Sequence, residues 1–523
     1  MQKAVYLFLM IISLPNIVLA QSGNFLGDGM QDIIRRNQLL GKVSPQSSLM
    51  INSFSDVNTA LDSLFPVTKK QNSRIQLLPL NIITQYNSNY PHGSNDGAMI
   101  PARGGQHLLA LGLKGSRGNF SFQLRPELVG AANTDFETFP TDHYPIIWEK
   151  YYQWLNNSDN PEKFGNTTYH KVFAGQSFIK YQYKNIAMGI STENIWWGPG
   201  RFNALVLSNN APGFAHLTVK TTRPFETAIG SFETQIIAGS LKASSILPAD
   251  RYRFDSSGAP IYQPKPNNAR SLVGMIMSWQ PKWTKGLFVG FTAVGYGYHG
   301  AATPHHKKAV LGSLFARYIM PAEQAELYFE YGRNDKIPQP LNLAFETGYP
   351  RAVIAGFRKL FPTKNKYCWE FAGEITQLQL PTADLTFTPG TSWYTSTSVS
   401  HGYTHQGQVL GAGIGPGSNS QSFDFSYVKG INKVGIKLER LVKNNDFYYN
   451  TFTQIKDFTR RWVDLSSTLH ADWQFKYCIV SAQLAFIRTQ NYQWYILEGP
   501  FEYFERGYDR VNFHSKIALT YRF

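Results

Sequence analysis

Alternation of apolar and polar residues with a period of two runs from Arg74 to the end of the chain, and it constrains the fold more than any other feature. In the final segment the two faces are Phe513, Ile517, Leu519, Tyr521 and Phe523 against His514, Lys516, Thr520 and Arg522. Such segments are about as long as a tilted membrane-crossing strand, ~9–11 residues. Apolar-out, charged-in alternation predicts an all-β, closed antiparallel transmembrane barrel. A soluble sandwich is the alternative, because alternation alone does not say which face meets lipid.

The composition fits a barrel and suggests the charge of its partners. Aromatic residues make up 15% of the chain, with 29 Tyr and 36 Phe, although the mean hydropathy is only -0.28. A barrel needs aromatic girdles outside and polar groups inside. The formal net charge of +15 favours an acidic partner, either an anionic polymer or anionic lipid head groups. Nucleic acid is not expected as a partner, since the N-terminal sequence predicts that the chain is exported.

The first residues have the three parts of a secretory signal peptide: Lys3, an apolar run over residues 5–14, and a small-residue cleavage site ending at Ala20. We therefore expect a signal peptide over 1–20, a short periplasmic helical region over 21–73 and the barrel over 74–523. Within the helical region, apolar spacing predicts one helix that ends near Gly41 and a second over residues 57–65. The expected location is the cell outer membrane, after removal of the signal peptide.

Connections of two lengths alternate along the barrel region. Short turns are expected at 115–119, 184–185, 281–286, 321–323, 430–432 and 476–477. Long connections are expected at 87–105, 133–169, 193–213, 244–269, 334–349, 380–420 and 491–508. Barrels place short turns in the periplasm and long loops outside, and counting crossings gives about 18 strands. A C-terminal strand that ends on Phe523 is typical of the signal read by the barrel-assembly machinery.

Residues 191–213 read STENIWWGPGRFNALVLSNNAPG and have neither a strand nor a helix period. A loop of this length needs a function or a partner to stay ordered, so we interpret it as the chief external ligand loop. Its candidate ligand-binding residues combine two adjacent rings with charges and amides: Glu193, Asn194, Trp196, Trp197, Arg201, Asn203, Asn209 and Asn210. The alternative is that the two Trp residues pack the loop into the barrel mouth.

Other loops add aromatic and charged candidates. Trp148, Tyr151, Tyr152 and Trp154 lie in the connection 133–169, and Asp96 and Arg103 lie in the connection 87–105. Sugar rings offer apolar faces with a rim of hydroxyls, which suits flat aromatic side chains that have a polar edge. An acidic sugar would add a charge partner for arginine. These residues are therefore further candidates for binding polysaccharide, although any single aromatic can equally be a packing residue.

The sequence offers no pattern for catalysis, a metal or a cofactor. Residues 411–417 are rich in glycine but lack a P-loop lysine, and the chain has no His-Glu-x-x-His or Gly-x-Ser-x-Gly motif. His299, His305 and His306 have no nearby carboxylate or cysteine in their loop, which disfavours a metal site. Cys368 and Cys478 fall on opposite strand faces, so we expect two isolated thiols.

Several segments resemble the capsule assembly Wzi family: 191–224, 95–104 (NDGAMIPARG), 123–127 (QLRPE) and 39–41 (LLG). The resemblance covers nearly all of the expected mature chain. It implies an outer-membrane barrel of eighteen strands, a small periplasmic helical region and a lumen closed by loops. It also implies a lectin that holds capsular polysaccharide on the cell surface.

Two functions remain open at this point. The first is a polysaccharide-binding lectin with a plugged lumen and no catalysis, whose partner is a capsular or other surface polysaccharide of acidic character. The alternative is a porin or a polysaccharide-export conduit. An enzyme is disfavoured because no nucleophile–base arrangement can be identified. In either case the outer-membrane lipid surrounds the barrel.

Overall fold

The computed structural model describes residues 29–44, 46–53, 75–248, 250–299, 308–334, 351–364, 367–380, 392–453, 459–497 and 507–522. The expected signal peptide, the second expected helix (57–65), His305, His306 and Phe523 lie outside these residues.

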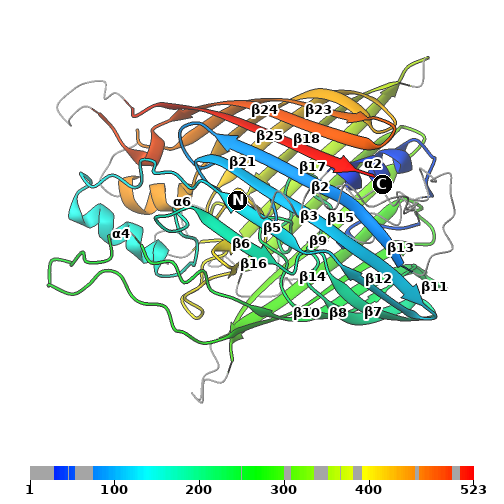
Figure 1. Ribbon diagram of the computed structural model, residues 1–523, viewed down its shortest axis with the longest axis horizontal. Helices are drawn as coiled ribbons and strands as arrows, with labels where there is room; N and C mark the ends of the chain where they lie inside the picture. Colours follow the sequence, from blue (N-terminus) through cyan, green and yellow to red (C-terminus); the bar gives the residue numbers. More distant parts are fainter. Residues whose placement is uncertain are drawn as a thin grey trace, which may run out of the picture.

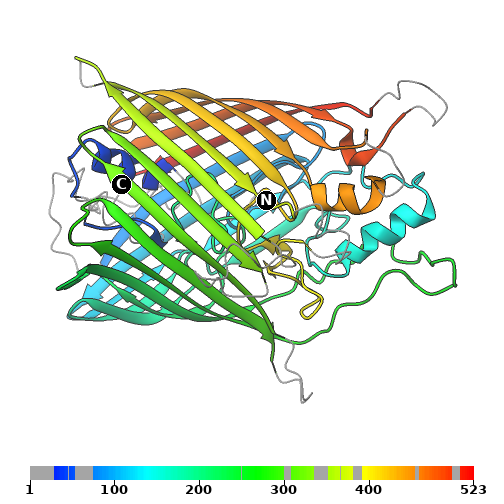
Figure 2. The same cartoon turned by 180° about the vertical axis from the view of Figure 1, so that it is seen from behind.

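The described chain forms a closed antiparallel barrel of 18 crossings (Figures 1 and 2). The barrel closes where β2 pairs with β25, with Leu80 opposite Tyr521. The wall strands are β2 Ile75–Asn87, β3 Gly104–Arg117, β4 Phe120–Leu124, β5 Glu127–Ala131, β6 Tyr169–Phe173, β7 Phe178–Tyr183, β8 Ile186–Ser191, β10 His216–Thr221, β11 Phe225–Thr227, β12 Gly230–Leu241, β13 Arg270–Pro281, β14 Leu287–Tyr298, β15 Lys308–Met320, β16 Ala325–Asn334, β17 Arg351–Pro362, β18 Cys368–Gln377, β21 Asn419–Lys429, β22 Asn432–Val442, β23 Val463–Gln474, β24 Cys478–Gln490 and β25 Arg510–Tyr521.

Three crossings are each built from two strand segments: β4 with β5, β6 with β7, and β10 with β11. Between β4 and β5 the interruption falls at Arg125 and Pro126. Proline has no N–H to donate to the ladder, so pairing stops there, and Arg125 bridges to Gly175 instead. The expected strand across residues 120–128 is therefore present, with a break in its middle.

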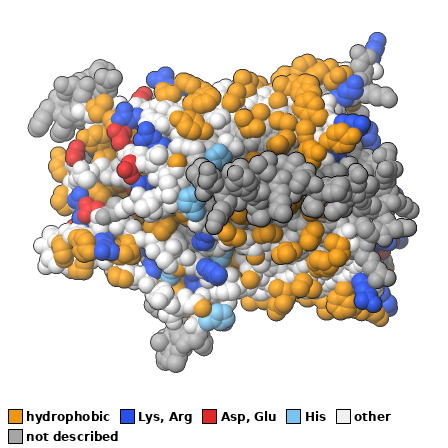
Figure 3. Space-filling model, in the orientation of Figure 1, with side chains coloured by type: hydrophobic (Ala, Val, Ile, Leu, Met, Phe, Trp, Pro, Cys, Tyr) orange, Lys and Arg blue, Asp and Glu red, His pale blue; other side chains and the backbone are white. Residues whose placement is uncertain are grey.

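The two faces of the wall divide as the alternation predicts. In β16, Leu327 and Phe329 are exposed on the outer face, whereas Glu326 and Glu330 are fully buried in the lumen. Apolar side chains cover much of the outer surface in Figure 3. A soluble sandwich would place its polar face outside, so this alternative is wrong.

The two ends of the barrel differ in the length of their connections. Short turns such as Lys184–Asn185 and Gly430–Ile431 lie at one end, which we call the turn end. The long connections lie at the other, the loop end, together with the helices α4 (Pro145–Leu155) and α6 (Asn445–Tyr448) and the π-helix η1 (Tyr449–Thr453). In Figure 1 the turn end is on the right and the loop end on the left. No helix among the described residues is long and apolar enough to span a membrane.

The first expected helix is present as α2 (Gly29–Leu39), and Gly41 follows it with a left-handed φ of 68°. The sequence places this helix in a periplasmic region separate from the barrel. The helix instead reaches wall residues inside the lumen at the turn end, where Arg36 pairs with Glu370 at 3.0 Å and Arg35 with Glu326 at 3.2 Å.

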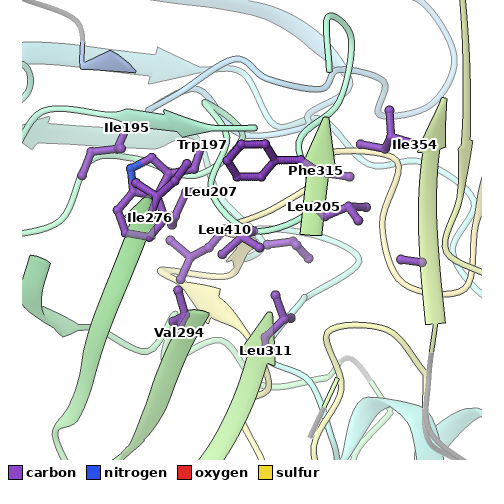
Figure 4. Close-up of a cluster of buried hydrophobic side chains, with 14 of the residues drawn as sticks. Ile195, Trp197, Leu205, Leu207, Ile276, Val294, Leu311, Phe315, Ile354 and Leu410 are labelled. Carbon is purple, nitrogen blue, oxygen red and sulfur yellow. The ribbon is translucent and has the colours of Figure 1, made fainter. Parts of the chain in front are cut away.

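The connection between β8 and β10 folds back into the lumen. Its strand β9 (Ile195–Trp197) pairs with β1 (Ile51–Ser53) of the N-terminal region, with Trp197 opposite Ile51. Trp197 is fully buried, and Figure 4 shows its ring beside Ile276 of the wall, near Leu207. The expectation of an exposed loop is therefore wrong. The loop and the N-terminal region together form what we call the plug.

Ion pairs join the two parts of the plug to each other and to the wall. Arg201 donates two hydrogen bonds to Asp32 of α2, at 2.9 and 2.8 Å, and a third to Glu370 of β18 at 3.0 Å. Asp32 also pairs with Arg358 of β17 and Lys433 of β22. Charged groups in the barrel interior are thus paired across the lumen rather than left facing an open channel.

A second long connection covers the plug from the loop end. The Tyr394 hydroxyl donates to the Leu205 carbonyl at 2.8 Å, and the Ser208 hydroxyl donates to the Gly411 carbonyl at 2.5 Å. The small strands β19 (Thr404–His405) and β20 (Gln408–Val409) lie within this connection. The described part of residues 378–418 therefore contributes to closing the lumen.

Candidate ligand-binding site

The loop end contains a cavity of about 620 Å³, which we call the loop-end cavity. Two long connections form its walls: 132–168, which contains helix α4, and 242–269. The lining residues include Phe139, Trp148, Tyr151, Tyr152, Ser158, Asp159, Glu162, Lys163, Leu247, Asp250, Arg251, Tyr252, Tyr262 and Lys265. Its size is within the range of pockets that hold small ligands, ~300–1,000 Å³.

Helix α4 supplies an aromatic wall of the cavity. Pro145 at the start of α4 suits the first turn, where its missing N–H would have no partner within the helix. Positions 148, 151 and 152 then share one face because residues three and four apart are neighbours on a helix. Tyr151 stacks on Phe139 with 4.0 Å between ring centroids and 1° between the ring planes. The helix is thus held by a buried aromatic cluster that also contains Phe447 and Trp494.

The connection 242–269 is fixed against the helix by specific contacts. The Tyr152 hydroxyl donates to the Asp250 carbonyl at 2.5 Å. The Asn156 amide donates to the Ile261 carbonyl at 2.9 Å. The Arg253 guanidinium lies 3.9 Å from the centre of the Trp148 ring, a cation–π contact. These contacts hold the two walls of the cavity together without a ligand.

Two polar groups at the cavity have no hydrogen-bond partner among the described residues. They are the indole Nε1 of Trp148, a side chain only 4% exposed, and the hydroxyl of Ser158, which is 2% exposed. Buried polar groups are nearly always paired, and each exception needs an explanation. A ligand rich in hydroxyl groups could accept from the indole and exchange hydrogen bonds with the serine.

Charged groups line the cavity, and two of them have shifted pKa values. Burial raises the pKa of Glu162 to about 7, although Gln493 donates a hydrogen bond to the carboxyl at 2.6 Å. Burial lowers the pKa of Lys265 to about 8. Asp159 is held by the Ser244 backbone N–H at 2.7 Å and by the Ser244 hydroxyl at 2.5 Å, and Asp250 pairs with Arg253. The carboxylates are thus either bonded internally or held toward the neutral form.

The sequence-based candidates are divided between several places. Trp148, Tyr151 and Tyr152 line the loop-end cavity, whereas Trp154 packs behind it. Arg103 donates to the carbonyls of Ser88 and Asp135 and is not among the cavity residues.

The candidates from residues 191–213 lie in the plug, and a ligand role for them stays a prediction. Glu193 pairs with Lys180 at 2.5 Å. Asn194 donates to the Ala211 carbonyl, Asn203 bonds Glu374 and Thr376, Asn209 donates to the Asn95 carbonyl, and Asn210 donates to the Val409 carbonyl. Trp196 is 7% exposed and Arg201 is 8% exposed.

A second cavity of about 240 Å³ lies between the plug and the wall strands β21 to β25. Asp96, Arg201 and Asn203 are among its lining residues. Asp96 pairs with Lys516 at 2.5 Å, and Arg201 pairs with Asp32. The charges named here are engaged with one another, so the loop-end cavity is the better candidate site.

Sequence reasoning did not identify Glu162, Arg251, Tyr252 and Lys265 as candidates. The connection 244–269 was noted only for its length, although the run Arg251-Tyr252-Arg253 places an exposed ring between two cations. Tyr252 is 70% exposed, and the Arg251 guanidinium lies 4.8 Å from its ring centre. That run was a signal for this part of the cavity wall.

Among the described residues no three His, Cys, Asp or Glu side chains gather as they would around a metal ion. Cys368 and Cys478 are free, as their strand faces indicated. The absence of a cofactor and of catalysis stays a prediction.

The fold and the cavity define a class: an 18-strand barrel whose lumen is plugged and whose loops enclose an aromatic cavity with two unpartnered polar groups. The sequence model of the capsule assembly protein Wzi family matches residues 100–491. The chain therefore belongs to the Wzi capsule assembly family. A search of curated proteins gives no match.

Solved structures agree with the fold. The chain resembles Wzi of Escherichia coli, described as an outer-membrane protein of group 1 capsule assembly and a carbohydrate-binding β-barrel. The TM-score is 0.59 at 11% identity, over 97% of this chain and 100% of that one. OccAB2 of Acinetobacter baumannii gives a TM-score of 0.41 at 12% identity, over 85% and 97% of the two chains. OccK8 of Pseudomonas aeruginosa gives 0.39 at 11% identity, over 86% and 98%. The last two similarities are too weak to bear on function.

Proposed function

We propose that the protein is an outer-membrane lectin that binds capsular or other surface polysaccharide and helps to attach or assemble it at the cell surface, without catalysis. The loop end faces the outside and the turn end faces the periplasm, after removal of the signal peptide. The observation that carries the proposal is the loop-end cavity, with its aromatic wall and the unpartnered polar groups of Trp148 and Ser158. Family membership and the carbohydrate-binding description of Escherichia coli Wzi support it.

The charges of the cavity favour an acidic sugar. Asp159 and Asp250 are bonded within the protein, and burial holds Glu162 toward its neutral form. Arg251 and Lys265 supply positive charge at the same cavity. A guanidinium and an ammonium are suited to a carboxylate or phosphate on the polymer.

The plug argues against the porin or export alternative. A channel needs a continuous aqueous path, but α2 enters the lumen from one end and the 192–215 loop from the other. Their contact through Asp32 and Arg201 lies inside the wall. Lipid around the barrel and recognition of the C-terminal strand by the barrel-assembly machinery complete the proposed set of partners.

Binding of purified protein to surface polysaccharide from the same cells tests the proposal. Tyr252→Ala removes an exposed ring from the cavity, and we expect about a fivefold loss of affinity per site, near 1 kcal/mol. A polymer contacts many barrels at once, so retention on whole cells should fall further. Tyr144→Ala is the matched control, because Tyr144 is 63% exposed on the same end, outside the cavity, and its side chain does not cap α4. Equal binding by wild type and Tyr252→Ala, both folded, would count against this cavity.

A further inference from the structure

Exposed lysines lie in or beside the short turns at the turn end of the barrel. They include Lys184, Lys282, Lys285, Lys364, Lys429 and Lys476, and the described positions of these turns contain no acidic residue. Glu226 and Glu323 lie at or in two other connections of the same end. Figure 3 shows Lys and Arg at the right-hand end, whereas most visible acidic side chains lie at the left. The described turns that hold these lysines therefore carry positive charge with no acidic residue in the same turn.

Four lysines of this end lie over aromatic rings. The distances from Nζ to the ring centre are 5.4 Å for Lys184 over Tyr183, 5.7 Å for Lys359 over Phe361, 4.4 Å for Lys429 over Tyr367 and 4.9 Å for Lys476 over Tyr477. We call Lys184, Lys359, Lys429 and Lys476 the lysine belt. Tyr183, Phe361 and Tyr477 are each about half exposed. Aromatic girdles of barrels sit at the level of the lipid head groups, so these contacts hold the ammonium groups at that depth.

The aromatic rings beneath the belt lie closest together where β18 meets β21. Tyr367 and Tyr427 stack at 4.8 Å, Trp369 lies 4.6 Å from Tyr427, and Trp369 stacks on Phe425 at 4.9 Å. Lys429 caps this ladder of rings. A ladder of stacked rings provides a flat surface for acyl chains, and the cation above it provides a partner for a phosphate.

We propose that the lysine belt binds the head groups of anionic phospholipids in the membrane leaflet at the turn end. The inference rests on the proposed outer-membrane location, in which this leaflet faces the periplasm. An ammonium held beside a phosphate gains a charge-assisted hydrogen bond. The occupant is a glycerophospholipid with net negative charge, such as phosphatidylglycerol, rather than the zwitterionic phosphatidylethanolamine.

A lipid fits these observations better than an acidic periplasmic protein does. The belt lysines lie at four hairpins, β7–β8, β17–β18, β21–β22 and β23–β24, of which the last three are consecutive in the wall. With Lys282 and Lys285 of β13–β14, the exposed lysines of the turn end lie on several sides of the barrel. A protein partner would contact one side of the rim, whereas a leaflet meets the whole circumference. The cation–π contacts also tie the lysines to rings on the lipid-facing surface instead of leaving them free in the aqueous phase.

Lipid competition on the purified full chain tests the inference. The protein is reconstituted in phosphatidylethanolamine vesicles, and brominated phosphatidylglycerol or brominated phosphatidylethanolamine is added to quench Trp fluorescence. Wild type should prefer phosphatidylglycerol, because each lysine at an anionic surface is worth roughly a fivefold change in partitioning. The preference should fall as salt is raised from 0.1 to 1 M. In the variant with all four belt lysines changed to Gln, phosphatidylglycerol should be preferred over phosphatidylethanolamine by no more than about twofold.

The control variant removes the same charge from the loop end by changing Lys171, Lys242, Lys308 and Arg488 to Gln. All four are exposed, and Lys171 also lies over a ring, that of Phe173. It should keep the preference for phosphatidylglycerol. Equal loss in both variants, or no preference in wild type, overturns the inference. Binding of poly-glutamate in solution that depends on the belt, without a lipid preference, would mean that the rim serves an acidic protein instead.

Folding is checked by heat-modifiable gel mobility, and Lys429→Gln alone repeats the test if the fourfold variant does not assemble. The effect of salt on the wild-type preference for phosphatidylglycerol gives a second test that needs no variant. Polysaccharide binding is measured on the same samples and should not change in the belt variant. Failure of the lipid preference thus leaves the lectin proposal intact, and failure of polysaccharide binding leaves the belt proposal intact.

Discussion

Trp197 shows how an aromatic residue on a long connection can pack into the interior of the barrel. Its indole Nε1 donates to Gln235 at 2.9 Å, and its ring lies against Gly274 of β13. A Cβ at Gly274 would come within 3.1 Å of the Trp197 ring and within 2.9 Å of Val294, so the missing side chain makes room for the indole. Tyr252, in contrast, is exposed and lies on a cavity wall.

We expect Trp197→Ala to destabilise the folded barrel by about 3–5 kcal/mol, because it empties a well-packed site and leaves the Gln235 Oε1 without the indole donor. The measurement is the urea midpoint of unfolding in micelles, with Tyr144→Ala as the control. Polysaccharide bound per folded barrel should not change. A loss of binding with an unchanged midpoint would support a ligand role for Trp197.

The pKa values of Glu162 and Lys265 predict pH-dependent binding. Glu162 becomes negative as the pH rises through about 7, and Lys265 loses its positive charge as the pH rises through about 8. The cavity is therefore more positive at pH 6 than at pH 9, by up to two charges. An acidic polysaccharide should bind about tenfold more tightly at pH 6, for two charges at ~6 Å in a water-like dielectric.

Glu162→Gln should remove the step of this pH profile near pH 7 and keep the one near pH 8. A neutral polysaccharide is the control and should show neither step. An unchanged profile in Glu162→Gln would show that the dependence arises elsewhere.

At the scale of elements, the sequence predicted the wall well. The turns Lys184–Asn185 and Gly430–Ile431 lie where the alternation breaks, and α2 ends before Gly41 as its apolar spacing indicated. These features are local, because period and turn chemistry are set by neighbouring residues. The count of about 18 strands follows from the same local signals.

The direction of a long connection is not a local property, and this is why the plug was missed. Nothing in the period of residues 191–213 distinguishes a loop that leaves the barrel from one that enters it. One signal was present: Ala204, Leu205, Val206 and Leu207 form an apolar run that is now almost completely buried. The loop-end cavity is also assembled from connections distant in sequence. The aromatic residues of its first wall were named as candidates, but their helix and the second wall were not predicted.

The contact between Asp32 and Arg201 makes a second prediction at this scale. Arg201→Met removes a charge that faces Asp32, Glu370 and Asp424, and breaking such a buried network by one partner costs roughly 3–5 kcal/mol. Asp32→Asn should cost a similar amount. The double variant should cost less than the sum of the two, measured by urea unfolding of folded barrels. Strict additivity would contradict a direct coupling between helix α2 and the loop.

For the whole molecule, the plug predicts an absence of steady porin-like current in planar bilayers. Deleting residues 29–53 removes α2 and β1, and it should give measurable conductance because the loop loses its partners Asp32 and Ile51. Heat-modifiable mobility verifies that the shortened barrel is closed. Currents of porin size from the intact chain would contradict the plugged lumen and favour the conduit alternative.

The plug also constrains the order of events during biogenesis. Its two parts come from the beginning and the middle of the chain, enter from opposite ends, and are joined by Asp32 and Arg201 inside the wall. The wall itself closes at the seam between the first and last strands, β2 and β25. If β2 and β25 paired early, the lumen around Glu326, Glu370 and Arg358 would be filled with water, and α2 would later have to displace that water. We therefore expect the interior to be gathered while the wall is still an open sheet, so that closure of the seam is the final step.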